Sequence, residues 1–126
     1  MLKAVIIDAS ALSRDLLNTV LIGGGYSVAG QTHTTSQGLA LVQKFHPHFV
    51  CIALDQIEDG HGIVEQIRAS LPKTIIFMVS GAIDAPTLQA ALARGVHGFI
   101  VKPFKADAVL KTIRNTVLAM VKKQQG

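Results

Sequence analysis

Apolar residues in this chain follow two alternating patterns, which predict strands and helices in turn. Short, nearly continuous apolar runs occur five times: AVIID (4–8), YSVAG (26–30), FVCIAL (49–54), TIIFMV (74–79) and HGFIV (97–101). Runs of this length are typical of strands, and those that are apolar almost throughout are expected to be buried on both faces. We therefore predict five strands.

Between these runs, apolar residues recur at spacings of three and four, the period of an amphipathic helix. Five helices are predicted, with the core-facing residues Leu12, Leu16, Leu17 and Val20; Leu39, Val42 and Phe45; Ile63, Val64, Ile67 and Leu71; Leu88, Ala91 and Leu92; and Leu110, Ile113, Val117 and Met120. The fourth helix is expected from about Ala85, with Pro86 in its first turn, and the last from about Ala106. Strands that alternate with such helices form parallel sheets covered on both faces. The predicted class is α/β, with five strands and five helices in a single domain, residues 1–126.

Composition narrows the class of protein further. The chain is 49% hydrophobic and 16% charged, as expected of an ordered globular domain. No apolar run approaches the ~18 residues of a membrane span, so no membrane association is expected. The net charge of +4 is weak and scattered, so we expect no direct contact with nucleic acid. The single cysteine, Cys51, excludes an internal disulfide, indicates a cytoplasmic protein, and is expected to pack in the core.

Two short patterns resemble binding motifs but are better explained by structure. The run Gly23 to Gly25 follows a predicted helix and precedes a strand, whereas a phosphate-binding turn follows a strand and opens a helix. We interpret it as a helix end and turn. The HPH sequence at 46–48 has metal-like spacing without further ligands nearby, and a helix end is a favourable place for histidine.

Candidate functional residues lie where the predicted strands end. Open α/β sheets bind ligands at the carboxyl ends of their strands, near the point where strand order reverses. The residues at these ends are Asp8 after the first strand, Ala53 to Asp55 after the third, Ser80 after the fourth and Lys102 after the fifth. A carboxylate, a hydroxyl and a lysine are thus expected on neighbouring strand ends.

These residues and their surroundings resemble the receiver domains of response regulators. The resemblance runs from Lys3 to about Lys122 and is carried by VIIDAS…R (Asp8, Arg14), DG…IR (Asp59, Gly60, Ile67, Arg68), VSGA (Ser80) and A…GVHGFIVKPF (Gly95, Gly98, Phe99, Lys102, Pro103, Phe104). It implies a doubly wound, flavodoxin-like (βα)5 fold with strand order 2-1-3-4-5. It also implies two-component phosphorelay signalling, in which a histidine kinase's phosphoryl group passes to an aspartate at the end of the third strand, helped by Mg²⁺.

The phosphoacceptor position departs from the family's pattern. Counting from Pro47, which resembles the proline that opens the third strand, places this position at Ala53. Counting back from the Asp-Gly pair at 59–60 places it at Ile52 instead. Neither side chain accepts a phosphoryl group. We therefore expect no phosphoacceptor at the strand end.

The metal position departs as well. Receivers usually place two adjacent acids after the first strand, and here Asp8 is followed by Ala9. Mg²⁺ requires near-octahedral oxygen coordination. Asp8 is the only residue that matches the family's metal ligands, and one carboxylate alone makes a poor Mg²⁺ site. Ser80 and Lys102 match the family's phosphoryl-contacting hydroxyl and lysine. We expect Asp8, Ser80 and Lys102 to form a vestigial pocket, with an ion pair between Asp8 and Lys102, no catalytic residue, no bound metal and no cofactor.

Asp55 is the alternative acceptor. It lies two residues beyond Ala53, so it would point to the same side if the strand continued that far. The favoured interpretation is a solvated acidic loop of Asp55, Glu58 and Asp59, in which Asp59 helps the start of the third helix. His61, between two glycines, is expected to be a solvated turn residue.

The favoured hypothesis is a receiver-like signalling module, not an enzyme, that acts by phosphorylation-independent contact with a histidine kinase or a downstream effector. The resemblance implies a contact face formed by the fourth helix, the fifth strand and the fifth helix, with Phe99 as its switch-like aromatic. Its exposed residues are expected to be Gln89, Arg94 and Lys111, whereas Leu88 and Leu92 are assigned to the core. Two alternatives stay open: a phospho-accepting receiver that uses Asp55, and a structural dimerisation module that forms a homodimer through the same face.

Overall fold

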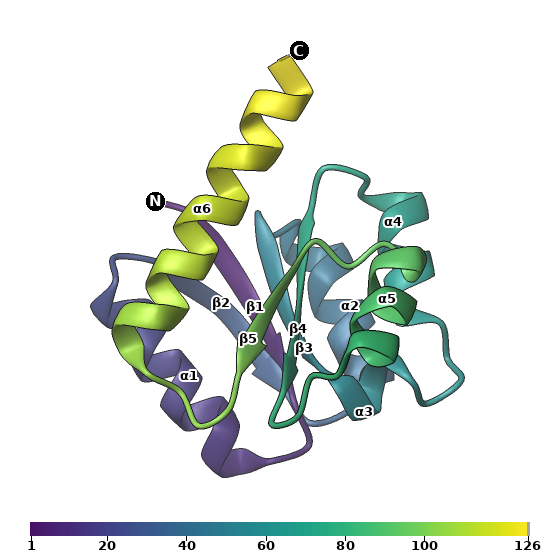
Figure 1. Ribbon diagram of the computed structural model, residues 1–126, viewed down its shortest axis with the longest axis horizontal. Coiled ribbons are helices and arrows are strands. Elements are labelled where there is room, and N and C mark those ends of the chain that lie inside the picture. The colour runs from purple at the N-terminus through teal and green to yellow at the C-terminus, as the bar shows by residue number, and fades with distance from the viewer. Residues whose placement is uncertain (126) are drawn as a thin grey trace.

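Five parallel strands form the centre of the molecule. The computed structural model describes residues 1–125, with the strands in the order β2-β1-β3-β4-β5 (Figure 1). All four neighbouring pairs are parallel. The strands are β1 (Lys3–Ile7), β2 (Ser27–Thr32), β3 (Phe49–Ala53), β4 (Ile75–Ser80) and β5 (Gly98–Val101). The predicted class and strand order are confirmed.

The helices lie on both faces of the sheet (Figure 1). They are α1 (Ala11–Gly23), α2 (Thr35–Phe45), α3 (Leu54–Ile57), α4 (Ile63–Ser70), α5 (Ala85–Arg94) and α6 (Ala106–Gln125). The prediction of five helices was wrong by one, because the segment after β3 forms the short helix α3. Four residues are too few to show a helical period in the sequence. No helix within the described residues is long and apolar enough to cross a membrane.

Local side-chain chemistry sets where the helices begin and end. Ser10, Thr34 and Asp84 accept hydrogen bonds from backbone N–H groups in the first turns of α1, α2 and α5. The run Gly23 to Gly25 ends α1 as predicted, and Gly25 has a φ of +89° that favours glycine. His46 ends α2 in the left-handed conformation, so the HPH histidine does lie at a helix end.

Two apolar layers fill the space between the sheet and its helices. One layer lies under α2, α4 and α5 and includes Val50, Ile52, Ile67 and Met78; the other lies under α1 and α6 and includes Leu17, Phe49, Cys51, Phe77 and Ile113. Cys51 is fully buried, and burial raises the pKa of its thiol. This placement confirms the predicted core role, because a thiol that stays protonated away from solvent is unreactive.

Three leucines that were assigned to the core are exposed. Leu12 and Leu16 are 69% and 49% exposed, and Leu92 is 49% exposed. In α1 the stripe formed by Leu17 and Leu21 faces the sheet, and the parallel stripe of Leu12 and Leu16 lies outside it. The periodicity is the same for both stripes, so spacing alone did not separate them. In α5 the buried residue is Ala91.

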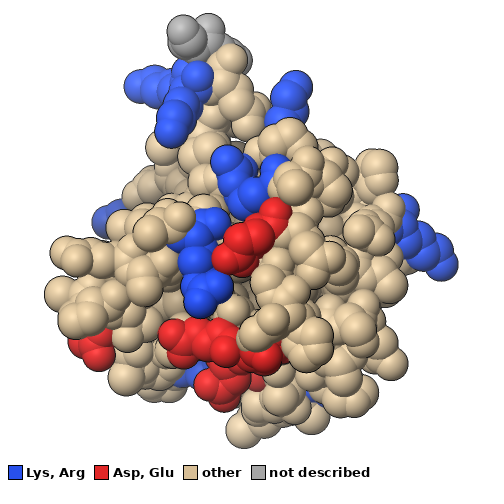
Figure 2. Space-filling view, turned by 90° about the vertical axis from the view of Figure 1, so that its right-hand side faces the viewer, with Lys and Arg blue, Asp and Glu red and all other residues tan. Residues whose placement is uncertain are grey.

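Acidic and basic side chains are segregated along the strand direction. All eight acidic residues lie at the carboxyl edge, where the strands end, in a loop or in the first two turns of the following helix: Asp8, Asp15, Asp55, Glu58, Asp59, Glu65, Asp84 and Asp107. The amino edge, where the strands begin, carries basic residues from strand starts and helix ends: Lys3, Lys44, Arg68, Lys73, Arg94, Lys122 and Lys123. Figure 2 shows acidic atoms in the lower and central part of one face, with most basic atoms above or at its margins. Acids near helix starts and bases near helix ends both complement the helix dipole.

Candidate functional site at the carboxyl edge of the sheet

The ends of β1, β3, β4 and β5 bring together the four positions identified from the sequence. Ile7 of β1 is paired with Ile52 of β3, so Asp8 and Ala53 follow on neighbouring strands. Ala53 is paired with Val79, and Ser80 with Val101, so Ser80 and Lys102 follow on the other side. The parallel register thus places a carboxylate, a methyl group, a hydroxyl and an ammonium at one edge.

Asp8 is held by contacts to all of its oxygens. Asp8 is 6% exposed. Its Oδ1 accepts a hydrogen bond from the Ser10 amide at 2.9 Å, and its Oδ2 lies 3.0 Å from Lys102 Nζ. Its backbone oxygen accepts a hydrogen bond from Arg14 Nη1 at 2.6 Å. The structure therefore contains the ion pair expected between Asp8 and Lys102, and the carboxylate is satisfied by the protein itself.

The third strand ends at Ala53, with no acidic side chain at its end. Ala53 is 6% exposed, and the next residue, Leu54, begins α3. Because the chain turns into a helix there, strand alternation does not extend to Asp55, which lies exposed in the first turn of α3. The geometric condition under which Asp55 would point into the site is not met.

Ser80 and Lys102 are linked through the backbone. The Lys102 amide donates a hydrogen bond to the Ser80 oxygen at 3.0 Å, which holds the ends of β4 and β5 together. The Ser80 hydroxyl donates to the Ala82 oxygen at 2.9 Å and accepts from the Ala82 amide at 3.3 Å. It therefore stabilises its own loop. The Lys102–Pro103 peptide bond is cis.

Asp59 does not help the start of the following helix, contrary to the prediction. The residue before α4 is Gly62, which makes no side-chain cap. Asp59 instead accepts hydrogen bonds from the Thr35 hydroxyl and from the His61 amide, the latter at 2.9 Å, and so links the acidic loop to α2. Burial acts to raise the pKa of Asp59, but these hydrogen bonds and the nearby His61 ring outweigh it and lower the pKa. His61 itself is exposed, as predicted.

Two polar residues of this region were missed by the sequence reasoning. Thr35 is buried at the start of α2, and its contact with Asp59 joins residues 24 positions apart. Gln56 is buried in α3, where its Nε2 donates weakly to the His33 oxygen at 3.5 Å; its Oε1 has no hydrogen-bond partner among the described residues. A glutamine in a short acidic segment carries no sequence signal of burial.

The residues present do not fit a bound Mg²⁺. The ion takes near-octahedral oxygen coordination and usually rests on one or two carboxylates plus phosphate oxygens. Asp8 is the only carboxylate at the four strand ends, and both of its oxygens are occupied. Across residues 1–125 no group of three metal-ligating His, Cys, Asp or Glu side chains occurs. A cation at this edge would have to displace Lys102 from the one carboxylate it could use.

We expect Mg²⁺ at millimolar concentration to leave the amide spectrum around Asp8 nearly unchanged. The reason is that the metal would have to break the ion pair with Lys102 and would find one carboxylate in return. Amide chemical shifts followed during a titration measure this directly. Saturable shifts at Asp8 and Asp55 together would contradict it, because they would mean that the loop acids complete a metal site.

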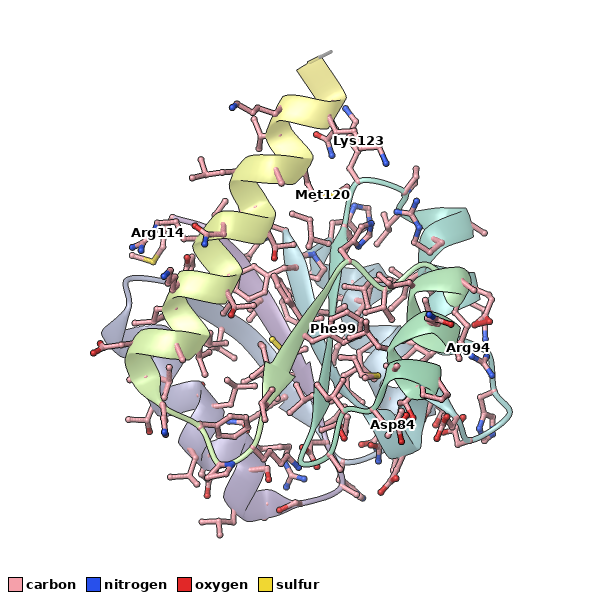
Figure 3. All side chains as sticks on the ribbon, in the orientation of Figure 1. Asp84, Arg94, Phe99, Arg114, Met120 and Lys123 are labelled. Atoms are coloured by element: carbon pink, nitrogen blue, oxygen red, sulfur yellow. The ribbon has the colours of Figure 1, made fainter. Side chains whose placement is uncertain are left out.

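The predicted contact face corresponds to α5, β5 and α6. Gln89 and Arg94 are exposed on α5, and Lys111 is exposed on α6. Phe99 of β5 is partly buried against the layer under α2, α4 and α5, and its side chain lies on the α5 side of β5 in Figure 3. Arg94 does not project freely, because its Nη1 lies 3.1 Å from Glu65 Oε2 of α4. It therefore belongs as much to the α4–α5 surface as to the predicted face.

A parallel sheet in the order 2-1-3-4-5, with Asp8, Ser80 and Lys102 at the ends of its strands, defines a receiver-type domain. Comparison with known families agrees with this class. The sequence model of the response regulator receiver domain matches residues 4–114. The chain therefore belongs to the response regulator receiver domain family.

Individual relatives support the same assignment. The chemotaxis protein CheY of Bacillus subtilis is 27% identical over 116 residues, which cover 91% of this chain and 97% of that protein. The structure of chemotaxis response regulator CheY4 of Vibrio cholerae is similar with a TM-score of 0.83 at 25% identity, over 92% of this chain and 98% of that one. A CheY-like receiver domain protein from Methanospirillum hungatei has the same fold, with a TM-score of 0.84 at 20% identity and 98% of each chain covered.

Proposed function

We propose that this chain is a receiver-like module of two-component signalling that acts by protein–protein contact, without accepting a phosphoryl group and without enzymatic activity. The observation that carries the proposal is the residue at the end of β3, which is Ala53. Phosphoryl transfer depends on positioning a nucleophile and on neutralising developing charge. Here the strand end has no nucleophile, and the ammonium of Lys102 is already neutralised by Asp8.

The direct test is chemical phosphorylation. Incubation of the protein with acetyl phosphate and Mg²⁺ should give no phosphorylated species by intact mass. Asp55 should not substitute, because a displaced nucleophile loses the orders of magnitude that good positioning supplies. A receiver with an aspartate at the end of its third strand, treated in parallel, shows that the donor is active.

One result would reverse the proposal. An alkali-labile, acid-stable phosphate on the native protein that disappears in Asp55→Asn would make Asp55 the acceptor. The same Asp55→Asn variant is then a matched control for the mass measurement, since the substitution changes one charge at an exposed position. Phosphate that persists in Asp55→Asn would also reverse the proposal and would assign another acceptor.

The partner surface is testable separately. We expect Gln89→Lys with Lys111→Glu to weaken capture of signalling partners from the source cell, because both side chains are exposed on the helices beside β5. Arg94 is unsuitable for this test, since its substitution would also break the pair with Glu65. Lys44→Glu, on α2 beside β1 and β2, is a control at a distant exposed position; it changes the net charge by two units, against one for the double variant, so a general charge effect would be larger in the control. Equal capture by all three proteins would place the partner surface elsewhere.

The same variants also test the alternative hypothesis that the chain is a structural dimerisation module. A homodimer through α5, β5 and α6 would show a mass that rises with protein concentration and falls in the Gln89 and Lys111 variant. We expect the molecular mass by light scattering to stay that of one chain, because the exposed apolar side chains of this face, Leu92, Val101 and Leu118, are interspersed with the exposed cations Arg94, Lys111 and Arg114. A concentration-dependent dimer without other partners would favour a structural dimerisation module.

A further inference from the structure

A continuous groove lies at the amino edge of the sheet, at the opposite end of the strands from Asp8 and Lys102. Its first part, which we call the apolar groove, has a volume of about 490 Å³ and is lined chiefly by Leu2, Pro47, Leu71, Ile75, Val117 and Val121. Its second part, the basic hollow, has a volume of about 400 Å³ and is lined by Arg68, Lys73, His97 and Lys123 around Leu92 and Val96. Pro72, Lys73, Met120 and Gln124 line both parts, so the two adjoin.

One wall of this groove is the end of α6. Figure 1 shows that the last turns of α6 extend beyond the sheet, where no other element among the described residues covers them. In Figure 3, Met120 and Lys123 lie on this projecting part, toward the loop before β4 and the end of α4. Val121 is 42% exposed there. The projecting turns therefore present apolar and basic side chains to an open space.

Within residues 1–125, the cations of the basic hollow have no acidic partner. The described ion pairs join His61 to Asp59, Arg94 to Glu65 and Lys102 to Asp8, and none of them includes Arg68, Lys73 or Lys123. Within the described residues, the acidic side chain that contacts an amino-edge cation is Glu65, which pairs with Arg94 and not with the cations of the basic hollow. The hollow therefore has a strongly positive surface that nothing within the described residues neutralises.

Arg68 is held in a fixed position in this hollow. Its Nη1 donates a hydrogen bond to the Pro72 oxygen at 2.8 Å. Its Cγ and Cδ pack so closely on Gly95 that a Cβ there would lie 3.0 Å and 3.2 Å from them. Its guanidinium donates no other hydrogen bond within the described residues, and a cation that is ordered in advance loses less entropy when it binds a carboxylate.

His97 lines the basic hollow beside Arg68 and Lys123. Its Nδ1 accepts a hydrogen bond from the Ile76 amide at 2.9 Å, so the neutral ring carries its proton on Nε2. Burial, and then the charges of Arg68 and Lys123, lower the pKa of His97. The ring therefore stays neutral beside the three cations and offers a further donor.

We propose that the amino-edge groove binds an acidic amphipathic segment of a partner protein, with apolar side chains in the apolar groove and carboxylates on Arg68, Lys73 and Lys123. Charge complementarity selects an acidic ligand, and the adjoining apolar surface selects a segment that also has hydrophobic side chains. A small anion would leave the apolar groove empty, and a nucleic-acid backbone would place phosphates against it. The proposal does not depend on how the carboxyl edge handles phosphate.

The test uses a designed peptide, since the partner is identified only by its chemistry. The probe is a fluorescein-labelled amphipathic helix with leucines on one face and glutamates on the flanking positions. Its control replaces every glutamate by glutamine. We expect saturable binding of the glutamate peptide by fluorescence anisotropy, at least about tenfold weaker binding of the glutamine peptide, and amide shifts at Lys73, His97 and Val121 without shifts at Asp8.

Two variants of α6 separate a specific site from general attraction. Lys123→Glu should weaken binding of the glutamate peptide by about tenfold, whereas Arg114→Glu should leave it within about twofold. Both side chains are exposed on α6, Arg114 near the middle of the helix and Lys123 near its end. Figure 3 shows Arg114 pointing away from the groove. The charge change is identical, so net charge cannot explain a difference.

Several results would overturn the proposal. These are no saturable binding of the glutamate peptide, equal binding of the glutamine peptide, or equal weakening by the two variants. Tighter binding of a single-stranded RNA oligonucleotide that is likewise lost in Lys123→Glu would assign the groove to nucleic acid instead. Self-association that is lost in Lys123→Glu would assign it to the acidic carboxyl edge of a second copy.

Discussion

Replacement of Phe77 by alanine should lower the free energy of unfolding by about 3–5 kcal/mol. The ring is fully buried in the layer under α1 and α6. It meets the Phe49 ring edge-on at 5.7 Å, and Phe49 meets Tyr26 in the same way at 5.3 Å. It also packs on Gly98 of β5, where a Cβ would lie 2.8 Å from its Cε1. Removing the ring therefore leaves a cavity that three strands surround and cannot close.

Urea denaturation followed by circular dichroism measures this loss. Phe45→Ala is the matched control, because Phe45 is half-buried at the end of α2 and has Lys44 over its ring at 5.2 Å. The control should cost less than half as much as Phe77→Ala. Equal losses in the two variants would contradict the assignment of Phe77 to the centre of the core. A loss of this size matters because small domains are stable by about 5–15 kcal/mol in total.

Replacement of Ala53 by aspartate should destabilise the protein by about 2 kcal/mol at neutral pH. The new carboxylate would stand at the buried end of β3, beside Asp8, with Lys102 as the one ammonium for two negative charges. Ala53→Asn has nearly the same shape without the charge. The difference between the two variants therefore isolates the electrostatic part of the loss.

The stability of the Ala53→Asp variant should depend on pH. Burial and the neighbouring Asp8 raise the pKa of the new carboxyl in the folded state above its value in the unfolded chain. The folded state then binds more protons, so stability falls as pH rises through this range and recovers on acidification. Denaturation of the aspartate variant at pH 7 and near pH 4, against the asparagine variant, measures the effect. The prediction would be contradicted if the aspartate and asparagine variants were equally stable at pH 7, or if the difference between their free energies of unfolding grew on acidification.

Much of the fold was predictable because the apolar pattern is set by burial in the sheet. β3 is apolar at every position, and counting from Pro47 placed its end at Ala53, where the structure ends it. The pairing of Asp8 with Lys102 also followed from the sequence, because parallel strands end at one edge and these two residues carry opposite charges there. The ion pair needed only sheet topology, whereas the count from Pro47 relied on the resemblance to receiver domains.

The remaining features depend on contacts between segments far apart in the sequence. The segment Leu54–Ile57 forms a helical turn because it packs beside β3, and nothing in four residues predicts this. Arg94 pairs with Glu65, 29 residues earlier, which moved it partly off the predicted face. The amino-edge groove is built from the chain start, the loops before β3 and β4, and α6, so no single stretch of sequence shows it.

The segregation of charge along the strands has a consequence for how this protein meets its partners. The acidic side chains lie toward the carboxyl edge and most of the Lys and Arg side chains lie toward the amino edge, so the molecule has an electric dipole along the strand direction. Such a dipole turns the domain in the field of an approaching charged protein before the two surfaces touch, and thereby raises the rate of productive encounters. Acidic partners are steered to the amino edge and basic ones to the carboxyl edge. The rate advantage falls as ionic strength rises, because salt screens the field over about 8–10 Å.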